Sequence, residues 1–246
     1  MLLEISGATL AGRLTPFSAQ VASGEVVHLV GPNGAGKSSL LAALAGLIAV
    51  AGEIRFAGRA LGDWPGAALA RQRAYLAQQQ VPPGQMPVWH YLHMHAQPGQ
   101  EPGAEVQLAI ADKLQLGDKL SCHLHQLSGG EWQRVRLAAV LLQLSQSDGK
   151  LLLLDEPLSG LDIAQQMAFD DLLPPFTARG GSVVMSSHDL NHSLQYADRV
   201  WLLRRGQQAV VGRPRQVLTP ENLSALYQVP FRLLEVEGRP MLTTLR

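Results

Sequence analysis

The sequence predicts an α/β fold in which a largely parallel sheet, wound with helices on both faces, is interrupted by an inserted helical subdomain. Residues 26–30, 150–154 and 182–185 are nearly unbroken apolar runs, as in parallel strands that are covered on both faces. Helical patterns lie between these runs, as expected of a doubly wound sheet. Residues 81–147 lack a β-branched run and carry helix-like patterns instead.

An antiparallel β element is expected beside the sheet, near the N-terminus. Phe17, Ala19 and Val21 alternate with polar residues, which predicts a strand with one solvated face. Ser23-Gly24 then forms a turn into the first apolar run, and residues 52–58 are predicted as a further antiparallel strand.

The remaining chain divides around the helical insertion. Pro82-Pro83-Gly84 opens the insertion, and helices are predicted over residues 105–116 and 131–144. Residues 1–80 and 148–246 then form the α/β core with its antiparallel β element. Within this core Thr219 and Pro220 have the residue types of a helix cap and a first helical position.

Composition and charge exclude several classes of protein. The chain has 246 residues with 20 basic and 20 acidic side chains, so it lacks the basic surplus of a duplex-binding protein and no nucleic-acid partner is expected. Cys122 is the single cysteine, which excludes an internal disulfide and favours a reducing compartment. The longest uncharged apolar stretch, residues 40–52, is shorter than the roughly 20 residues needed to span a bilayer. We expect a soluble, intracellular protein that reaches membranes through a partner.

A phosphate-binding loop follows the first apolar strand. Its residues fit the pattern G-x-x-x-x-G-K-[ST] and are Gly31, Pro32, Asn33, Gly34, Ala35, Gly36, Lys37 and Ser38, with Ser39 next in the helix. Glycines let backbone N–H groups converge on an anion, and Lys37 is expected to reach the β- and γ-phosphates. The Ser38 hydroxyl is expected to ligate Mg²⁺. An ordinary glycine-rich turn is the alternative, which the strand–loop–helix context disfavours.

Two acids and a histidine come directly after two other buried strands. Ligands of open α/β sheets gather at the carboxyl ends of strands, so Asp155 and Glu156 are expected to face the phosphates. Asp155 suits the Mg²⁺ shell, and Glu156 is the candidate general base. His188 could hydrogen-bond the γ-phosphate and the attacking water. An acidic turn and a core histidine are the corresponding structural alternatives.

A second anion site is predicted at the segment Ser128, Gly129, Gly130 and Glu131, which we call the signature segment. Ser128 has the residue type of a helix cap, and the two glycines bare the backbone N–H groups that follow. With Leu127 the segment resembles the LSGGQ signature of ABC ATPases, with Glu131 in the usual Gln position. A plain helix cap is the alternative.

Together with the phosphate loop, the two acids and His188 in this order, the signature segment makes essentially the whole chain resemble an ABC ATPase. The resemblance implies a P-loop NTPase fold of the ABC ATPase type that uses ATP and Mg²⁺. It also implies a head-to-tail pair of copies in which each signature segment closes on the nucleotide of the opposite subunit.

The resemblance assigns further residues. Gln78 matches the glutamine that contacts Mg²⁺ and water, although Gln79 and Gln80 leave that assignment open by a residue or two. Ser159 and Asp162 match the D-loop that contacts the partner copy. The family usually stacks adenine on an aromatic residue, but residues 7–14 contain none. Leu10 or Leu14 are the aliphatic alternatives.

The C-terminal residues 212–230 are similar to the tails of ATPases that serve iron-siderophore and cobalamin importers. This implies an ATP-hydrolysing translocase subunit at the cytoplasmic face of the inner membrane, peripheral to two transmembrane permease subunits and indirectly to a solute-binding protein. Cobalamin is the expected solute. The alternative is a soluble ABC-type ATPase that acts on nucleic acid or protein complexes.

A histidine-rich stretch remains outside these assignments. His90 and His93 share a helix face and could bind zinc. We instead expect an interface near the membrane partner, to which Trp89 and Tyr91 would contribute.

Overall fold

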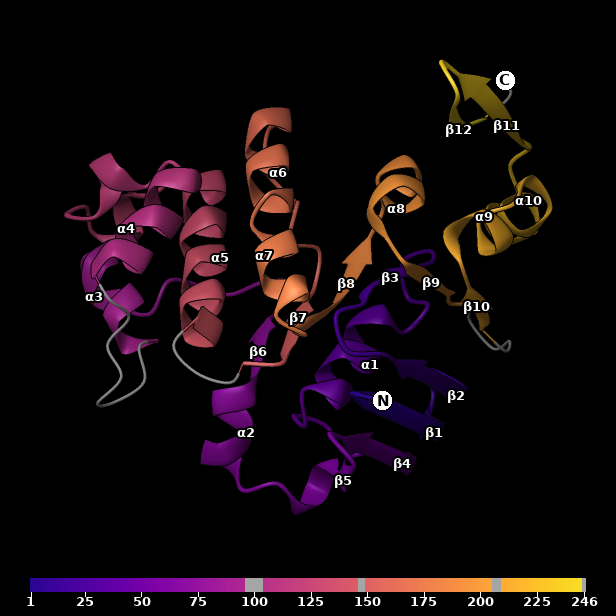
Figure 1. Ribbon diagram of the computed structural model, residues 1–246, viewed down its shortest axis with the longest axis horizontal. Coiled ribbons are helices and arrows are strands. Elements are labelled where there is room, and N and C mark those ends of the chain that lie inside the picture. Colours follow the sequence, from indigo (N-terminus) through magenta and orange to yellow (C-terminus); the bar gives the residue numbers. More distant parts are fainter. Residues whose placement is uncertain (96–103, 146–148, 205–208, 245–246) are drawn as a thin grey trace.

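The computed structural model describes residues 1–95, 104–145, 149–204 and 209–244. Its central sheet has six strands in the order β10-β9-β3-β8-β7-β6 (Figure 1). All neighbours are parallel except β10, which is antiparallel to β9. The strands of this sheet are β3 (Val26–Val30), β6 (Arg73–Leu76), β7 (Leu151–Leu154), β8 (Ser182–Ser187), β9 (Arg199–Leu202) and β10 (Val210–Gly212). The predicted parallel core is confirmed.

Side-chain alternation along β7 separates the two faces of this sheet. Leu152 and Leu154 belong to the hydrophobic cluster that includes helices α5 (Gly129–Ser145) and α7 (Leu173–Ala178). Leu151 and Leu153 belong to the cluster on the other face, with helix α1 (Lys37–Leu44) and the antiparallel sheet. Both faces of the strand are therefore covered, which explains its unbroken run of leucines.

The antiparallel element is a separate sheet of four strands in the order β2-β1-β4-β5. Its strands are β1 (Leu3–Leu10), β2 (Leu14–Val21), β4 (Ala51–Phe56) and β5 (Arg59–Ala60). Phe17, Ala19 and Val21 are buried, as their alternation predicts. The strand predicted over residues 52–58 is wrong at its far end, because Ala57 and Gly58 have φ angles of 48° and 78° and turn the chain into β5.

Residues 88–145 supply helices that lie side by side at one end of the molecule (Figure 1). They are α3 (Val88–Met94), α4 (Ala104–Lys113) and α5, with short 3₁₀ turns at Gly117–Lys119 and Leu124–Gln126. The helix predicted over residues 105–116 is wrong at its C-terminal end, because α4 stops at Lys113 and Gln115 has a φ of 52°. The hydrophobic cluster of these helices continues into the sheet at Leu152 and Val183, so they pack directly on the core.

The C-terminal part covers the β9–β10 side of the sheet. It contains α8 (Leu190–Tyr196), α9 (Pro214–Val217), α10 (Pro220–Tyr227) and the hairpin of β11 (Phe231–Val236) and β12 (Arg239–Thr244). The predicted cap of α10 is confirmed, because Thr219 Oγ1 accepts a hydrogen bond from the Asn222 N–H at 3.2 Å. The other helices are a 3₁₀ turn at Leu61–Asp63, α2 (Gly66–Gln72) and α6 (Ile163–Asp170). Among the described residues, no helix combines the length and apolar composition needed to cross a bilayer.

Candidate functional site

Four adjacent strands of the central sheet end at one edge and deliver the predicted chemistry there. The phosphate loop follows β3, His188 follows β8, the acids follow β7 and Gln78 lies two residues after β6. A cavity of about 490 Å³ opens at this edge. It is lined by Gly12, Arg13, Asn33, Gly34, Ala35, Gly36, Lys37, Ser38, Ser39, Gln78 and Glu156. The sheet therefore brings residues from distant parts of the chain to one site.

The phosphate loop has the backbone geometry that its glycines permit. Gly34 and Gly36 have φ angles of 77° and 100°, in the left-handed region. A Cβ on Gly36 would lie 2.5 Å from the carbonyl oxygen of Arg13, so no larger residue fits without moving the turn between β1 and β2. Helix α1 begins directly after Gly36 and directs its free N–H groups at the cavity.

Lys37 is buried and its ammonium is held by the loop itself. Nζ donates to the carbonyl oxygens of Gly31 at 2.6 Å and of Pro32 at 3.2 Å. Burial lowers the pKa of Lys37, an effect that the nearby carboxylates of Glu156 and Asp155 oppose. An ammonium has three N–H donors, so one remains for a phosphate oxygen.

Asp155 is almost fully buried and is oriented by Ser186. Ser186 Oγ donates to Asp155 Oδ1 at 2.7 Å and accepts from the Glu156 N–H at 2.7 Å. The second oxygen, Asp155 Oδ2, is buried and has no hydrogen-bond partner within the described part of the chain. A buried carboxylate oxygen without a partner suits a cation ligand, so the residues fit Mg²⁺ with Ser38 and Gln78 on the cavity wall.

Ser186 was not among the site residues predicted from the sequence. A signal that could have identified it is a buried polar residue directly after the apolar residues 183–185 of β8.

Glu156 and His188 are in direct contact. His188 Nε2 lies 2.6 Å from Glu156 Oε1, and because an ionised carboxylate only accepts hydrogen bonds, Nε2 then carries the hydrogen. Glu156 also has a φ of 51°, an uncommon conformation for a non-glycine residue. The contact therefore fixes a side chain on a strained backbone at the cavity.

Of the three consecutive glutamines, only Gln78 lines the cavity. The carbonyl oxygen of Gln80 is instead turned toward helix α5, where it accepts a hydrogen bond from Trp132 Nε1 at 2.7 Å. The position of Gln78 agrees with the sequence-based assignment, and its role stays a prediction.

The signature segment forms a capping box at the start of α5. Ser128 Oγ accepts from the Glu131 N–H at 3.3 Å, and Glu131 Oε2 accepts from the Ser128 N–H at 2.8 Å. Lys119 Nζ lies 3.0 Å from Glu131 Oε1. The Ser128 backbone N–H, followed by Lys119, lowers the pKa of Glu131 to about 2. Glu131 is thus a charged cap at the position where the ABC signature has an amide.

The signature segment does not line the cavity of its own chain, so the two predicted anion sites are separate within one molecule. It packs instead on the loop that contains Ser159, since a Cβ on Gly130 would lie 2.8 Å from the Gly160 carbonyl oxygen. Asp162 caps α6, where its Oδ1 accepts from the Gln165 N–H at 2.8 Å. No partner copy is needed for either contact.

Two sequence-based alternatives do not agree with the structure. Leu14 is buried, and neither it nor Leu10 lines the cavity, whereas Gly12 and Arg13 do. An interface role for Tyr91 is wrong, because its ring is buried 5.1 Å from that of Trp132.

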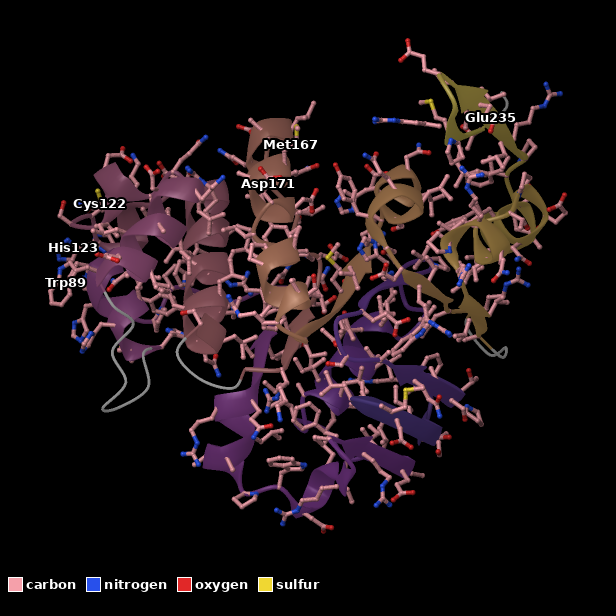
Figure 2. All side chains as sticks on the ribbon, viewed as in Figure 1. Trp89, Cys122, His123, Met167, Asp171 and Glu235 are labelled. Atoms are coloured by element: carbon pink, nitrogen blue, oxygen red, sulfur yellow. The ribbon has the colours of Figure 1, made fainter. Side chains whose placement is uncertain are left out.

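Trp89 is half exposed on the outer face of the helices, as Figure 2 shows. No group of three or more His, Cys, Asp or Glu side chains suited to a metal exists among the described residues, so the zinc alternative for His90 and His93 finds no support.

Comparisons with known proteins show what this chain is similar to. Residues 14–159 match the family model described as ABC transporter. The chain is 53% identical over 244 residues to the "Vitamin B12 import ATP-binding protein BtuD" of Salmonella heidelberg, a match that covers 98% of this chain and 97% of the relative. The protein of the same name from Escherichia coli is 50% identical over 245 residues, covering 98% of each chain.

Solved structures are also similar. An ATP-binding subunit of an ABC transporter has a TM-score of 0.78 at 26% identity and covers 88% of this chain and 92% of its own. An inward-facing metal-chelate type ABC transporter has a TM-score of 0.78 at 23% identity, covering 100% and 98%, which shows the shared fold.

Proposed function

Because the chain belongs to the ABC transporter family, we propose that it is the ATP-hydrolysing subunit of an importer that takes up vitamin B12 (cobalamin). One observation carries the proposal: the phosphate loop, Gln78 and Glu156 line a single cavity in a chain that is 53% identical, over 98% of its length, to vitamin B12 import ATP-binding proteins. Similarity over nearly the whole chain includes the C-terminal residues, which lie outside the matched family model.

In this proposal the phosphate loop holds the triphosphate. Backbone N–H groups of residues 33–39 surround the phosphates, and the free donor of Lys37 bonds a γ-phosphate oxygen. Ser38, Gln78 and Asp155 would hold Mg²⁺, which would supply positive charge against the triphosphate. The unpartnered Asp155 Oδ2 supports this assignment.

Glu156 acts as general base toward the attacking water, and His188 holds its carboxylate in place. The 2.6 Å contact leaves Glu156 Oε2 free to accept a proton from water. Gln78 stands on the same cavity wall, where its amide orients the water. The positions of Glu156 and Gln78 on the cavity wall support these roles.

The active unit is a head-to-tail pair of copies. The segment Ser128, Gly129, Gly130 and Glu131 closes on the triphosphate held by the other copy, and Ser159 and Asp162 contact that copy. The separation of the signature segment from the cavity of its own chain supports this arrangement. Each copy therefore contributes one half of each of the two nucleotide sites.

Coupling to the membrane completes the proposal. The pair docks on two permease subunits at the cytoplasmic face of the inner membrane, and a solute-binding protein delivers cobalamin. Residues 81–147 form the helical subdomain that passes movement from the permeases to the core of residues 1–80 and 148–246. The helices α3–α5 lie together at one end of the molecule, as this role requires (Figure 1).

The catalytic test replaces Glu156 by Gln in the complex purified with its membrane partners. The amide cannot accept the proton, so Mg²⁺-dependent ATP hydrolysis should fall at least about a hundredfold while ATP binding persists and traps the closed pair. Near-normal hydrolysis by Glu156→Gln would remove Glu156 from the catalytic role.

The substrate test measures uptake of labelled cobalamin by cells that lack this chain. Wild type should restore uptake and Glu156→Gln should not. An ATPase that hydrolyses normally but neither co-purifies with membrane proteins nor supports cobalamin uptake would contradict the importer assignment.

A further inference from the structure

One pair of side chains on helix α5 holds the backbone beside both of the proposed catalytic groups. Gln133 Nε2 donates to the carbonyl oxygen of Pro157 at 2.9 Å, and Pro157 directly follows Glu156. Arg136 Nη2 donates to the carbonyl oxygen of Ala77, which directly precedes Gln78. Arg136 Nη1 donates to Gln133 Oε1 at 2.9 Å, so the two side chains are joined to each other.

Both side chains of this pair are buried and lie on one unbroken helix. Positions 133 and 136 are three apart and therefore share a face of α5, which runs without a break from Gly129 to Ser145. Gln133 is 7% exposed and Arg136 is 3% exposed, so water hardly competes for these hydrogen bonds. Removal of one member would leave buried carbonyl and amide groups without partners.

The same helix begins at the signature segment, whose Ser128 caps it. A single rigid element therefore carries the second anion site at its start and contacts both catalytic loops within its first two turns. Trp132, whose Nε1 donates to the Gln80 carbonyl at 2.7 Å, adds a second bond from α5 to the segment after β6.

We propose that Gln133 and Arg136 are positioning residues that set the spacing between Gln78 and Glu156 and link both to the signature helix. The inference rests on the proposed function, because it assumes that Gln78 and Glu156 perform hydrolysis. Because α5 is one unbroken helix, we expect a displacement of the segment around Gln78 to be passed through Arg136 and Gln133 to the loop of Glu156.

The test compares Arg136→Met and Gln133→Leu in the assembled complex, since both retain side-chain volume and remove the donors. We expect kcat for ATP hydrolysis to fall about tenfold or more, because a misplaced catalytic group loses much of its effect. KM for ATP should change less than about threefold, because the phosphate loop is not touched. The double variant should be no worse than the poorer single variant, since both residues act through one network.

Arg134→Met is the matched control. Arg134 is also a buried arginine of α5, but its Nη1 donates to the carbonyl oxygens of Leu114 and Gln115 at 2.9 Å, away from both catalytic loops. It should lower the melting temperature about as much as Arg136→Met and leave kcat within about twofold of wild type. Arg136→Lys should recover part of the lost kcat, because one ammonium donor can still reach Ala77 or Gln133.

The outcomes separate this inference from the proposed function. An inactive Glu156→Gln complex with fully active Arg136→Met and Gln133→Leu complexes overturns the positioning role alone. Equal loss of kcat in Arg134→Met and Arg136→Met also overturns it, since general destabilisation then explains both. If Arg136→Met does not fold, Gln133→Leu and Arg136→Lys carry the same comparison, and normal kcat in both refutes the proposal.

Discussion

Ser186 shows how much of the site depends on a single hydroxyl group. Its Oγ donates to the Asp155 carboxylate and at the same time accepts the Glu156 N–H, so one side chain orients Asp155 and holds the backbone of Glu156. Glu156 is held in a left-handed backbone conformation, which persists only where the surroundings determine it. The arrangement of Asp155 and Glu156 therefore depends on the neighbouring strand β8.

Ser186→Ala is expected to lower kcat for ATP hydrolysis by at least about tenfold, because both acids lose an orienting bond. The free energy of unfolding should fall by about 1–3 kcal/mol, since buried groups are left without partners. Ser182→Ala is the control, because Ser182 is equally buried in β8 and makes two backbone hydrogen bonds, to Ala22 and Gly24, far from the cavity. Similar loss of turnover in both variants would contradict the role of Ser186.

The buried side chain of His28 is expected to make the free energy of unfolding depend on pH. Its side chain in β3 is fully buried, Nδ1 contacts Ser193 Oγ at 3.0 Å and its ring stacks on His192. Desolvation, followed by the charge of His192, lowers the pKa of His28 from 6.5 to about 3. Below pH 6.5 His28 binds a proton in the unfolded state but stays neutral in the folded state. The free energy of unfolding therefore decreases as pH falls.

The expected loss from His28 between pH 7.5 and pH 5 is about 2 kcal/mol in the free energy of unfolding. His28→Gln should lack this part of the pH dependence in urea unfolding curves, whatever its stability at pH 7.5. His93→Gln, at an exposed position of α3, should keep the wild-type dependence. A wild-type slope in His28→Gln would show that other groups cause it.

At the scale of elements, the start of α5 is constrained at Gly130 but not at Gly129. Gly130 packs against the Gly160 carbonyl, where a Cβ would lie 2.8 Å away, whereas a Cβ on Gly129 meets nothing within 4 Å. Substitution of each glycine by Ala therefore tests a different contact. At Gly130 it tests packing inside the chain, and at Gly129 it tests contact with another molecule.

Gly130→Ala is expected to lower the melting temperature, because the loop that carries Ser159 must shift. Gly129→Ala should leave the melting temperature of the isolated chain within about 2 °C of wild type and weaken ATP-dependent pairing in a Glu156→Gln background. Light scattering of that double variant with ATP measures the pairing. An unaltered fraction of dimer would contradict a phosphate contact at Gly129.

The elements also show what sequence reasoning reaches. Local signals predicted the phosphate loop, the capped α10 and the buried strands, since each depends on residues that are adjacent in the chain. The predicted ends of β4 and α4 are wrong where Ala57 and Gln115 adopt a positive φ. Neither residue type is typical of that conformation, so the sequence does not indicate it. Glu156 and His188 were expected at one edge of the sheet because each follows a buried strand, whereas Gln78 was assigned from the family resemblance.

Contacts between elements that are distant in the chain could not be predicted from the sequence. Ser186, Gln133 and Arg136 are common residue types without a distinctive spacing, and they matter because strand β8 and helix α5 lie beside the catalytic loops. The direct contact of His188 with Glu156 depends likewise on the β7–β8 register.

For the whole molecule, the separation of the signature segment from the cavity leads to a prediction about mixed pairs. If each site combines the phosphate loop of one copy with the signature segment of the other, two differently inactivated chains complement each other. A pair of Lys37→Ala with Ser128→Arg contains one site that carries both defects and one site that carries neither.

Pairs of Lys37→Ala with Ser128→Arg, isolated after co-expression with two different affinity tags, should therefore hydrolyse ATP at about half the wild-type rate, although each variant alone is inactive. The control pair combines Lys37→Ala with Glu156→Gln. Both of these residues belong to the same half of a site, because they lie around one cavity of one chain, so each of the two sites keeps one defect and no activity returns. Absence of activity in the first pair, or its return in the control pair, would mean that the phosphate loop and the signature segment of different copies do not share a nucleotide.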